Sequence, residues 1–255
     1  MKINIIGSGS MGKQITSLFM LMGYDVYLWQ NSKNLKIENQ INLEIEKLKK
    51  NLNSNELGNF TLVNNLSNFK NNFTIETIKE DVVLKRKIIN SLEYDENIFS
   101  NTSSIKLEDI GPNVNGLHFM NPISLKYVEL CKKKKYSEEV LDLLISRLQK
   151  LSYNIINVKD TPGFLINKLI FKDISYFFYL IEKENFNKND ILNIYKKNII
   201  KNDPIKILNL IGLDTALSIL KNLNNYDKSF YIPLCLQKAV SENILGYKNK
   251  KLFKL

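Results

Sequence analysis

The stretch Lys2-Ile-Asn-Ile-Ile-Gly7-Ser-Gly-Ser-Met-Gly12 decides the fold of this chain. A short apolar run ends in three glycines spaced G-x-G-x-x-G, and apolar residues then recur at helical spacing as far as Met22. This pattern predicts a strand, a glycine turn and a helix, and residues 26–29 supply a second strand. A turn of this kind holds the pyrophosphate of a dinucleotide at the start of the helix. The residues that we expect at the dinucleotide are Gly7, Ser8, Gly9, Met11 and Gly12.

The alternation of strand and helix patterns continues through the first 158 residues. Further strands are expected at 73–78, 98–99, 114–119, 127–131 and 153–158, with helices at 33–52, 82–92 and 138–151. Such alternation predicts an α/β fold with a Rossmann-type, doubly wound, mostly parallel sheet. No strand pattern returns beyond residue 160. We therefore expect a nucleotide-binding domain over 1–158 and an all-helical domain over 159–255.

Composition excludes several classes of protein. With 255 residues, 44% of them hydrophobic, the chain can bury a core and is not predicted to be disordered. No apolar run reaches the roughly 20 residues that cross a bilayer, and the chain has no signal-peptide pattern at its start, so a cytoplasmic location is expected. The net charge of +10 is dispersed among asparagines without a recognition module, which argues against nucleic-acid binding. Cys131 and Cys235 lack metal-type spacing, so we expect no metal.

Gln30 follows the second expected strand, where an acidic residue normally binds the adenosine ribose. A neutral amide still forms a hydrogen bond to a hydroxyl, but it does not repel a 2′-phosphate. The sequence therefore favours NAD and leaves NADP open.

His118 is the only histidine in the chain, so any imidazole that acts as a base near neutral pH must belong to this residue. It ends an expected strand, and Glu129 follows eleven residues later on the next one. Adjacent strands bring such a carboxylate to the imidazole. The residues alone leave open a structural histidine and a solvent-facing glutamate.

These residues resemble the L-3-hydroxyacyl-CoA dehydrogenases, including the bacterial 3-hydroxybutyryl-CoA dehydrogenases. The resemblance covers nearly the whole chain. It is carried by the glycine turn, Ser100-Asn-Thr-Ser-Ser104, the segment from Gly116 to Pro122, Val128-Glu129, and the D-T-P-G-F-x-x-N string that ends at Asn167.

The resemblance implies an enzyme of fatty acid metabolism that transfers hydride between C3 of a 3-hydroxyacyl thioester and the nicotinamide. His118 would take the proton of the 3-hydroxyl and Glu129 would orient its ring, while Ser103 and Asn167 would contact the reacting oxygen. A homodimer formed through the helical domain is also implied. The other positions that match cofactor-lining residues of the family are Glu80, Lys85, Asn101, Ser103 and Asn121.

Two alternatives stay open. The segment 35–62 is shorter than the helical hairpin that helps the family to bind CoA, and a basic surface suits an acidic acyl carrier protein. The first alternative is thus a dehydrogenase of a hydroxyacyl group tethered to such a carrier, as in a polyketide extender-unit pathway. The second is a non-catalytic nucleotide-binding relative, whose sign would be loss of His118 or Glu129; both residues are present.

Overall fold

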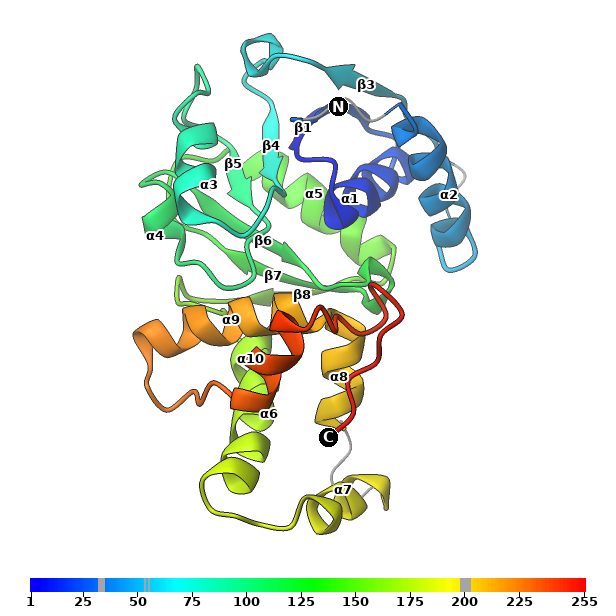
Figure 1. The fold of residues 1–255 in the computed structure, drawn as a ribbon. Helices are drawn as coiled ribbons and strands as arrows, with labels where there is room; N and C mark the ends of the chain where they lie inside the picture. Colours follow the sequence, from blue (N-terminus) through cyan, green and yellow to red (C-terminus); the bar gives the residue numbers. More distant parts are fainter. Residues whose placement is uncertain (32–34, 53, 55, 198–202) are drawn as a thin grey trace. The chain divides into compact units, whose positions relative to one another are not determined.

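A mostly parallel sheet forms the centre of the amino-terminal part of the chain (Figure 1). The computed structural model describes residues 1–31, 35–52, 54, 56–197 and 203–255. Within these residues the sheet has eight strands in the order β3-β2-β1-β4-β5-β6-β7-β8, and every neighbouring pair is parallel except β6 with β7. The strands are β1 (Lys2–Ile6), β2 (Asp25–Trp29), β3 (Phe60–Val63), β4 (Phe73–Glu76), β5 (Ile98–Ser100), β6 (Asn115–Phe119), β7 (Tyr127–Cys131) and β8 (Asn154–Asn157).

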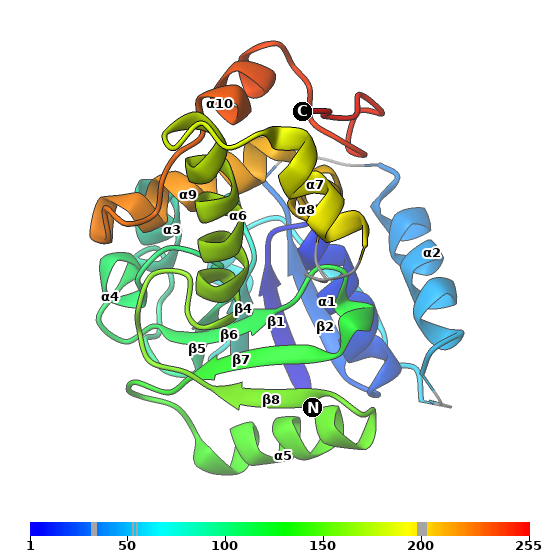
Figure 2. The ribbon, with the colours of Figure 1, turned by 90° about the horizontal axis from the view of Figure 1, so that it is seen from below.

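Helices cover both faces of this sheet (Figure 2). They are α1 (Ser10–Leu21), α2 (Ile37–Lys49), α3 (Val82–Ile89), the short α4 (Leu107–Ile110) and α5 (Glu138–Lys150). The apolar sides of α1, α2 and α5 share one core with Ile3 and Ile5. Because side chains alternate along a strand, Ile6 faces the other way and packs with Trp29 and with Ile88 of α3. This two-sided burial confirms the doubly wound α/β fold.

Some elements differ from the expected ones. The strand predicted at 73–78 ends at Glu76, and the helix predicted at 33–52 begins at Ile37, with residues 33 and 34 outside the described part of the chain. The edge strand β3 and the four-residue α4 were not predicted. In β3, Thr61 and Leu62 are exposed, so it lacks the buried run typical of the central strands.

The carboxyl ends of the central parallel strands meet at one edge of the sheet. Ile6 pairs with Glu76, and Glu76 pairs with Ser100. The loops that follow β1, β4 and β5 therefore leave the sheet side by side. In open α/β sheets, ligands bind outside this edge, where the strand order reverses.

The rest of the chain forms a second compact unit, Pro162–Leu255, after a first unit of Met1–Thr161. The sequence placed this boundary between residues 158 and 159. The helices of the second unit are α6 (Ile166–Glu182), α7 (Lys188–Lys196), α8 (Pro204–Ile211), α9 (Leu213–Tyr226) and α10 (Leu234–Ser241). Its core includes Phe171, Ile174 and Phe178 of α6 against Leu213 and Leu220 of α9. Its described residues form helices and one isolated bridge, as the all-helical prediction requires.

The search for a membrane-crossing segment, limited to the described residues, found no helix with both the length and the apolar character that a bilayer span needs.

Candidate active site

In the glycine turn, the start of α1 packs closely against the backbone that follows β1. Gly7 has a positive φ of 112°, a conformation that favours glycine, and its N–H donates to the Trp29 carbonyl at 2.9 Å. A Cβ on Gly12 would stand 1.9 Å from the Gly7 carbonyl oxygen and 2.8 Å from Oγ1 of Thr77. Gly12 thus allows α1 to pack directly against the turn. The Thr77 hydroxyl donates to the carbonyls of Ile6 and Gly7 at 3.1 and 2.9 Å and ties the turn to the loop after β4.

The start of α1 presents backbone N–H groups to solvent. Gly9 is its N-cap residue, and among the described residues no side chain caps the helix there. The position of a Cβ on Gly9 has no described atom within 4 Å. Ser8 and Met11, both half-buried, flank this opening. An uncapped helix N-terminus beside an open glycine fits the phosphates of a dinucleotide.

Gln30 carries a second feature that fits the adenosine end of such a cofactor. It follows β2 directly, and its Oε1 is buried without a hydrogen-bond partner among the described residues. A buried acceptor without a partner costs free energy, and a ribose hydroxyl is a donor that removes this cost.

His118 and Glu129 face each other across the antiparallel pair β6–β7. The register places the two residues directly opposite, and Nδ1 of His118 lies 2.8 Å from Oε2 of Glu129. Both residues are buried, at 5% and 0% exposure. A carboxylate at Nδ1 selects the tautomer with its proton on Nδ1, so that Nε2 is the nitrogen that accepts a proton.

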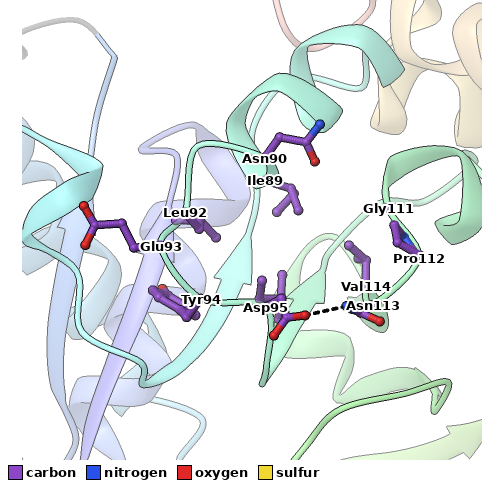
Figure 3. A pocket seen from close by; sticks show the side chains of 11 residues that line it. Ile89, Asn90, Leu92, Glu93, Tyr94, Asp95, Gly111, Pro112, Asn113 and Val114 are labelled. Carbon is purple, nitrogen blue, oxygen red and sulfur yellow. Dashed lines mark hydrogen bonds between the residues drawn. The ribbon is translucent and has the colours of Figure 1, made fainter.

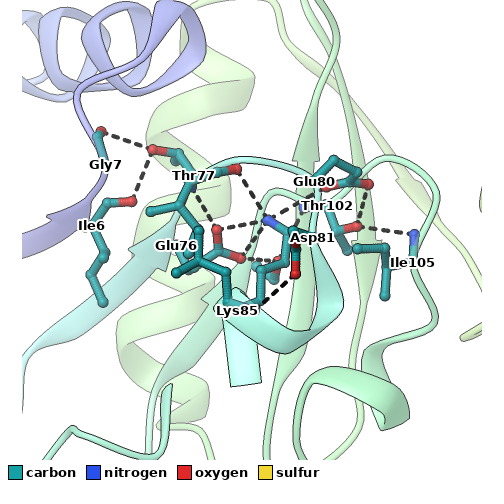
Figure 4. A network of polar contacts seen from close by, with 12 residues as sticks. Ile6, Gly7, Glu76, Thr77, Glu80, Asp81, Lys85, Thr102 and Ile105 are labelled. Atoms are coloured by element: carbon teal, nitrogen blue, oxygen red, sulfur yellow. Dashed lines mark hydrogen bonds and ion pairs between the residues drawn. The ribbon is translucent and has the colours of Figure 1, made fainter. Parts of the chain in front are cut away.

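The segment that begins at the last residue of β5, residues 100–105, is called the serine turn below. Oε1 of Glu80 accepts from the backbone N–H groups of Ser103 and Ser104, both at 2.9 Å. It also accepts from the hydroxyls of Thr102 at 2.7 Å and Ser104 at 3.0 Å, and Oγ of Ser103 lies 3.4 Å away. One carboxylate oxygen therefore organises this turn. Figure 4 shows Glu80 beside Thr102.

Lys85 and Glu76 lie behind Glu80 in the same network. Nζ of Lys85 donates to Oε1 and Oε2 of Glu76 at 2.7 and 2.9 Å and lies 3.4 Å from Oε2 of Glu80. Burial opposes the charge of Lys85, but the two carboxylates outweigh it and raise the pKa of Lys85. Burial likewise opposes the charge of Glu80, but Lys85 and the hydrogen bonds from the serine turn lower the pKa of Glu80.

Two asparagines connect neighbouring loops. Oδ1 of Asn101 accepts from the Phe119 N–H at 2.8 Å, which ties the serine turn to the end of β6. Oδ1 of Asn121 accepts from Gln14 of α1 at 3.4 Å, and Gln14 in turn accepts from the Ile123 N–H at 3.0 Å. The glycine turn, the serine turn and the histidine strand are thus linked within the first unit.

Comparison with known proteins now identifies the family. Residues 2–161 match the sequence model of the 3-hydroxyacyl-CoA dehydrogenase, NAD binding domain. The chain belongs to the 3-hydroxyacyl-CoA dehydrogenase family. It is accordingly an NAD-dependent oxidoreductase, and the glycine turn, the uncapped α1 and Gln30 all lie in its NAD-binding domain.

Similarity extends beyond that domain. The chain is 26% identical to the mitochondrial hydroxyacyl-coenzyme A dehydrogenase of Sus scrofa over 98% of its own length and 90% of that protein. It is 26% identical to the 3-hydroxybutyryl-CoA dehydrogenase of Clostridioides difficile, with 98% and 97% covered. The solved (S)-3-hydroxybutyryl-CoA dehydrogenase PaaH1 of Ralstonia eutropha has the same fold, with a TM-score of 0.75, 21% identity and coverage of 100% and 99%.

The remaining predicted residue of this dehydrogenase, Asn167, lies in the second unit. It is the second residue of α6 and is buried at 5% exposure. Its contact with the reacting oxygen remains a prediction, as do the catalytic and cofactor roles of the other expected residues.

Glu76, Thr102 and Ser104, which hold the serine turn, were not predicted, although charged residues at 76, 80 and 85 beside an apolar strand are a signal for a buried ion network.

A pocket of about 310 Å³ lies away from these residues (Figure 3). It is lined from Ile89 to Ile98 and from Gly111 to Val114, and Asn113 donates across it to Asp95 at 2.8 Å. Ile98 begins β5, whereas the serine turn follows the end of that strand. The pocket is therefore at the opposite edge of the sheet from the glycine turn.

In the described part of the dehydrogenase, no three His, Cys, Asp or Glu side chains are grouped so that they could hold a metal ion.

Proposed function

We propose that this dehydrogenase interconverts a 3-hydroxyacyl-CoA and its 3-oxoacyl-CoA, with His118 as the general base and acid. The observation that supports this role best is the buried pair of His118 and Glu129, whose Nδ1 and Oε2 atoms lie 2.8 Å apart. Bound NAD supplies the hydride acceptor for C3. In oxidation, the proton of the 3-hydroxyl moves to Nε2 of His118, and in reduction the same nitrogen returns it.

The carboxylate of Glu129 stabilises the imidazolium that forms in this transfer. Because Glu129 is fully buried, its attraction for the protonated ring is little screened by solvent. Ser103 and Asn167 are proposed as hydrogen-bond donors to the reacting oxygen, on which charge develops. Eight of the remaining expected residues are proposed along the cofactor: Gly7, Ser8, Gly9, Met11, Gly12, Gln30, Asn101 and Asn121. Glu80 and Lys85 were also expected there; Lys85 contacts Glu80, and Glu80 contacts the serine turn.

CoA as the carrier is supported by the names of the relatives, which are hydroxyacyl-coenzyme A and 3-hydroxybutyryl-CoA dehydrogenases. The decisive experiment follows NAD(P)H absorbance with acetoacetyl-CoA or a carrier-bound 3-oxoacyl group, each with NADH or NADPH. We expect turnover of acetoacetyl-CoA with NADH. Turnover restricted to the carrier-bound substrate would replace CoA by an acyl carrier protein, and inactivity in all four combinations would contradict the proposed reaction.

We also propose a homodimer and a cytoplasmic location. Several large apolar side chains of the helical unit are exposed: Leu169 by 65%, Tyr176 by 56%, Leu210 by 62% and Leu234 by 63%. The dimer is implied by the family resemblance, and these exposed side chains are available to its interface. Cys131 and Cys235 are both free thiols, as a reducing compartment requires.

A further inference from the structure

The buried ammonium of Lys85 has no part in the proton and hydride transfer proposed above. Its side chain is 1% exposed, and it lies on α3, which begins one turn before it. Lysine is among the residues least often buried, because removing its charge from water is costly. The carboxylates around Lys85 offset the cost of burying its charge, so we ask what this ion network holds in place.

The hydrogens of this ammonium are all directed into the protein. A lysine has three, and Nζ of Lys85 has acceptors at 2.7 and 2.9 Å on Glu76 and at 3.3 Å on the Ile78 carbonyl. Its further ion pair is with Oε2 of Glu80 at 3.4 Å. Among the described residues, therefore, the whole hydrogen-bonding capacity of Lys85 is used within the network rather than toward a ligand.

Glu80 transmits this anchoring to the serine turn. Oε2 of Glu80 faces Lys85, and Oε1 receives the two backbone N–H groups of Ser103 and Ser104. Charge-assisted hydrogen bonds of this type are short and strong. Fixing two successive amides fixes the backbone from which the Ser103 hydroxyl projects.

The segments on either side of this point are held by separate carboxylates. Oε2 of Glu76 accepts from the Ser100 hydroxyl at 2.6 Å, where the turn begins. After the turn, Asp160 accepts from the N–H groups of Leu107 and Glu108 at 2.7 and 3.1 Å and caps α4. The Ser103 segment is thus held at its start, middle and end.

We propose that Glu80 and Lys85 are positioning residues for Ser103: Lys85 fixes the Glu80 carboxylate, and Glu80 fixes the serine turn that presents the Ser103 hydroxyl to the reacting oxygen. This inference rests on the proposed function of Ser103. In this proposal Lys85 affects turnover by holding Glu80, and not by contacting the cofactor.

The test uses Glu80→Gln, which keeps the shape of the side chain, together with Lys85→Met and the control Lys87→Met. Lys87 is exposed on the same helix. Since a displacement of about 1 Å can cost on the order of 10²-fold in rate, we expect Glu80→Gln to lower kcat for acetoacetyl-CoA by about 10- to 100-fold. The Kd for NADH, measured by fluorescence titration, should stay within about twofold, and Lys87→Met should resemble the parent chain.

A double variant separates positioning from general support of the fold. If Glu80 acts through Ser103, adding Glu80→Gln to Ser103→Ala lowers kcat no further than about threefold below Ser103→Ala alone. A loss that multiplies with that of Ser103→Ala would overturn the proposal. So would a rise in the Kd for NADH, of about tenfold or more, in either Glu80→Gln or Lys85→Met.

Hydrogen–deuterium exchange gives a readout that does not depend on turnover. Peptides covering residues 100–106 should exchange about tenfold faster in Glu80→Gln and Lys85→Met, whereas peptides from α1 should not change. Unchanged exchange at 100–106 overturns the proposal even if the enzyme is active. If the parent chain reduces no thioester, the proposed function fails, and the exchange experiment still decides whether Glu80 and Lys85 hold the turn.

Discussion

The proposed chemistry depends on how a few residues are oriented. His118 and Glu129 occupy opposite positions of an antiparallel pair, where side chains on one face of the sheet come within reach of each other. A shift of the register by one residue would turn one of the two side chains to the other face. The 2.8 Å contact between them is therefore a direct consequence of strand pairing.

Gln30 gives a prediction about cofactor choice. Its buried Oε1, with no partner in the described part of the chain, suits a ribose hydroxyl, but the amide carries no charge against a 2′-phosphate. Gln30→Asp should raise the ratio of the NADPH Kd to the NADH Kd by at least about tenfold, because two negative charges then face each other at short range. Gln149→Asp, at an exposed position of α5, is the control. An unchanged ratio in Gln30→Asp would place the 2′ position of the ribose elsewhere.

At the scale of elements, the central strands were predicted well because each is a short apolar run between loop residues. Strands β1 and β7 have the predicted bounds, and β5 and β6 lie within one residue of them. The edge strand β3 was missed because most of its side chains are not buried. The hydrogen bonds from the serine turn to Glu80 could not be derived from spacing, since they join two loops whose proximity depends on the pairing of β4 with β5.

Two glycines where β1 meets α1 should respond differently to substitution by alanine: one variant should lose stability and the other affinity for NADH. Gly12→Ala forces a Cβ to within 1.9 Å of the Gly7 carbonyl oxygen, and overpacking of about 1–3 kcal/mol or more should lower the Tm by about 3–10 °C. Gly9→Ala meets open space in the described structure, so the Tm should change by no more than about 1 °C, while the Kd for NADH rises by about tenfold or more. Calorimetry and fluorescence titration measure the two effects. Equal losses of stability in both variants would contradict this difference.

In the helical unit, Asn209 of α8 holds the end of the chain. Its Oδ1 accepts from the Phe253 N–H at 2.7 Å, and its Nδ2 donates to the Phe253 carbonyl at 3.0 Å. Asn209→Ala leaves both groups of Phe253 without these partners and should cost about 1–3 kcal/mol. We expect faster proteolysis near residue 250 and a lower Tm than in the control Asn189→Ala, an exposed position in α7. Parent-like proteolysis would show that other contacts hold the tail.

At the scale of the whole molecule, the chain joins an NAD-binding unit, with eight strands among its described residues, to a helical unit. The sequence predicted this order of units because strand patterns stop near residue 160, and the described residues after Asn157 likewise form no further strand. The similarity to the Clostridioides difficile enzyme spans 98% of the chain, so it includes both units.

The oligomeric state is a prediction for the whole molecule. The family resemblance leads us to expect a dimer, with twice the chain mass of 29.6 kDa, in light scattering at micromolar concentration. Leu210→Lys and Leu234→Lys introduce a charge at two exposed apolar positions of the helical unit and should weaken the dimer. A parent chain that remains monomeric at these concentrations would remove the dimer from the account.

The most direct test of the central claim is the steady-state rate of His118→Gln with acetoacetyl-CoA and NADH. Loss of a general acid–base group should lower kcat by about 10²–10⁴-fold, and the Kd for NADH should stay within about twofold because the glycine turn is intact. A variant that folds, binds NADH and retains kcat within about threefold of the parent would contradict the assignment of His118 as the group that transfers the proton.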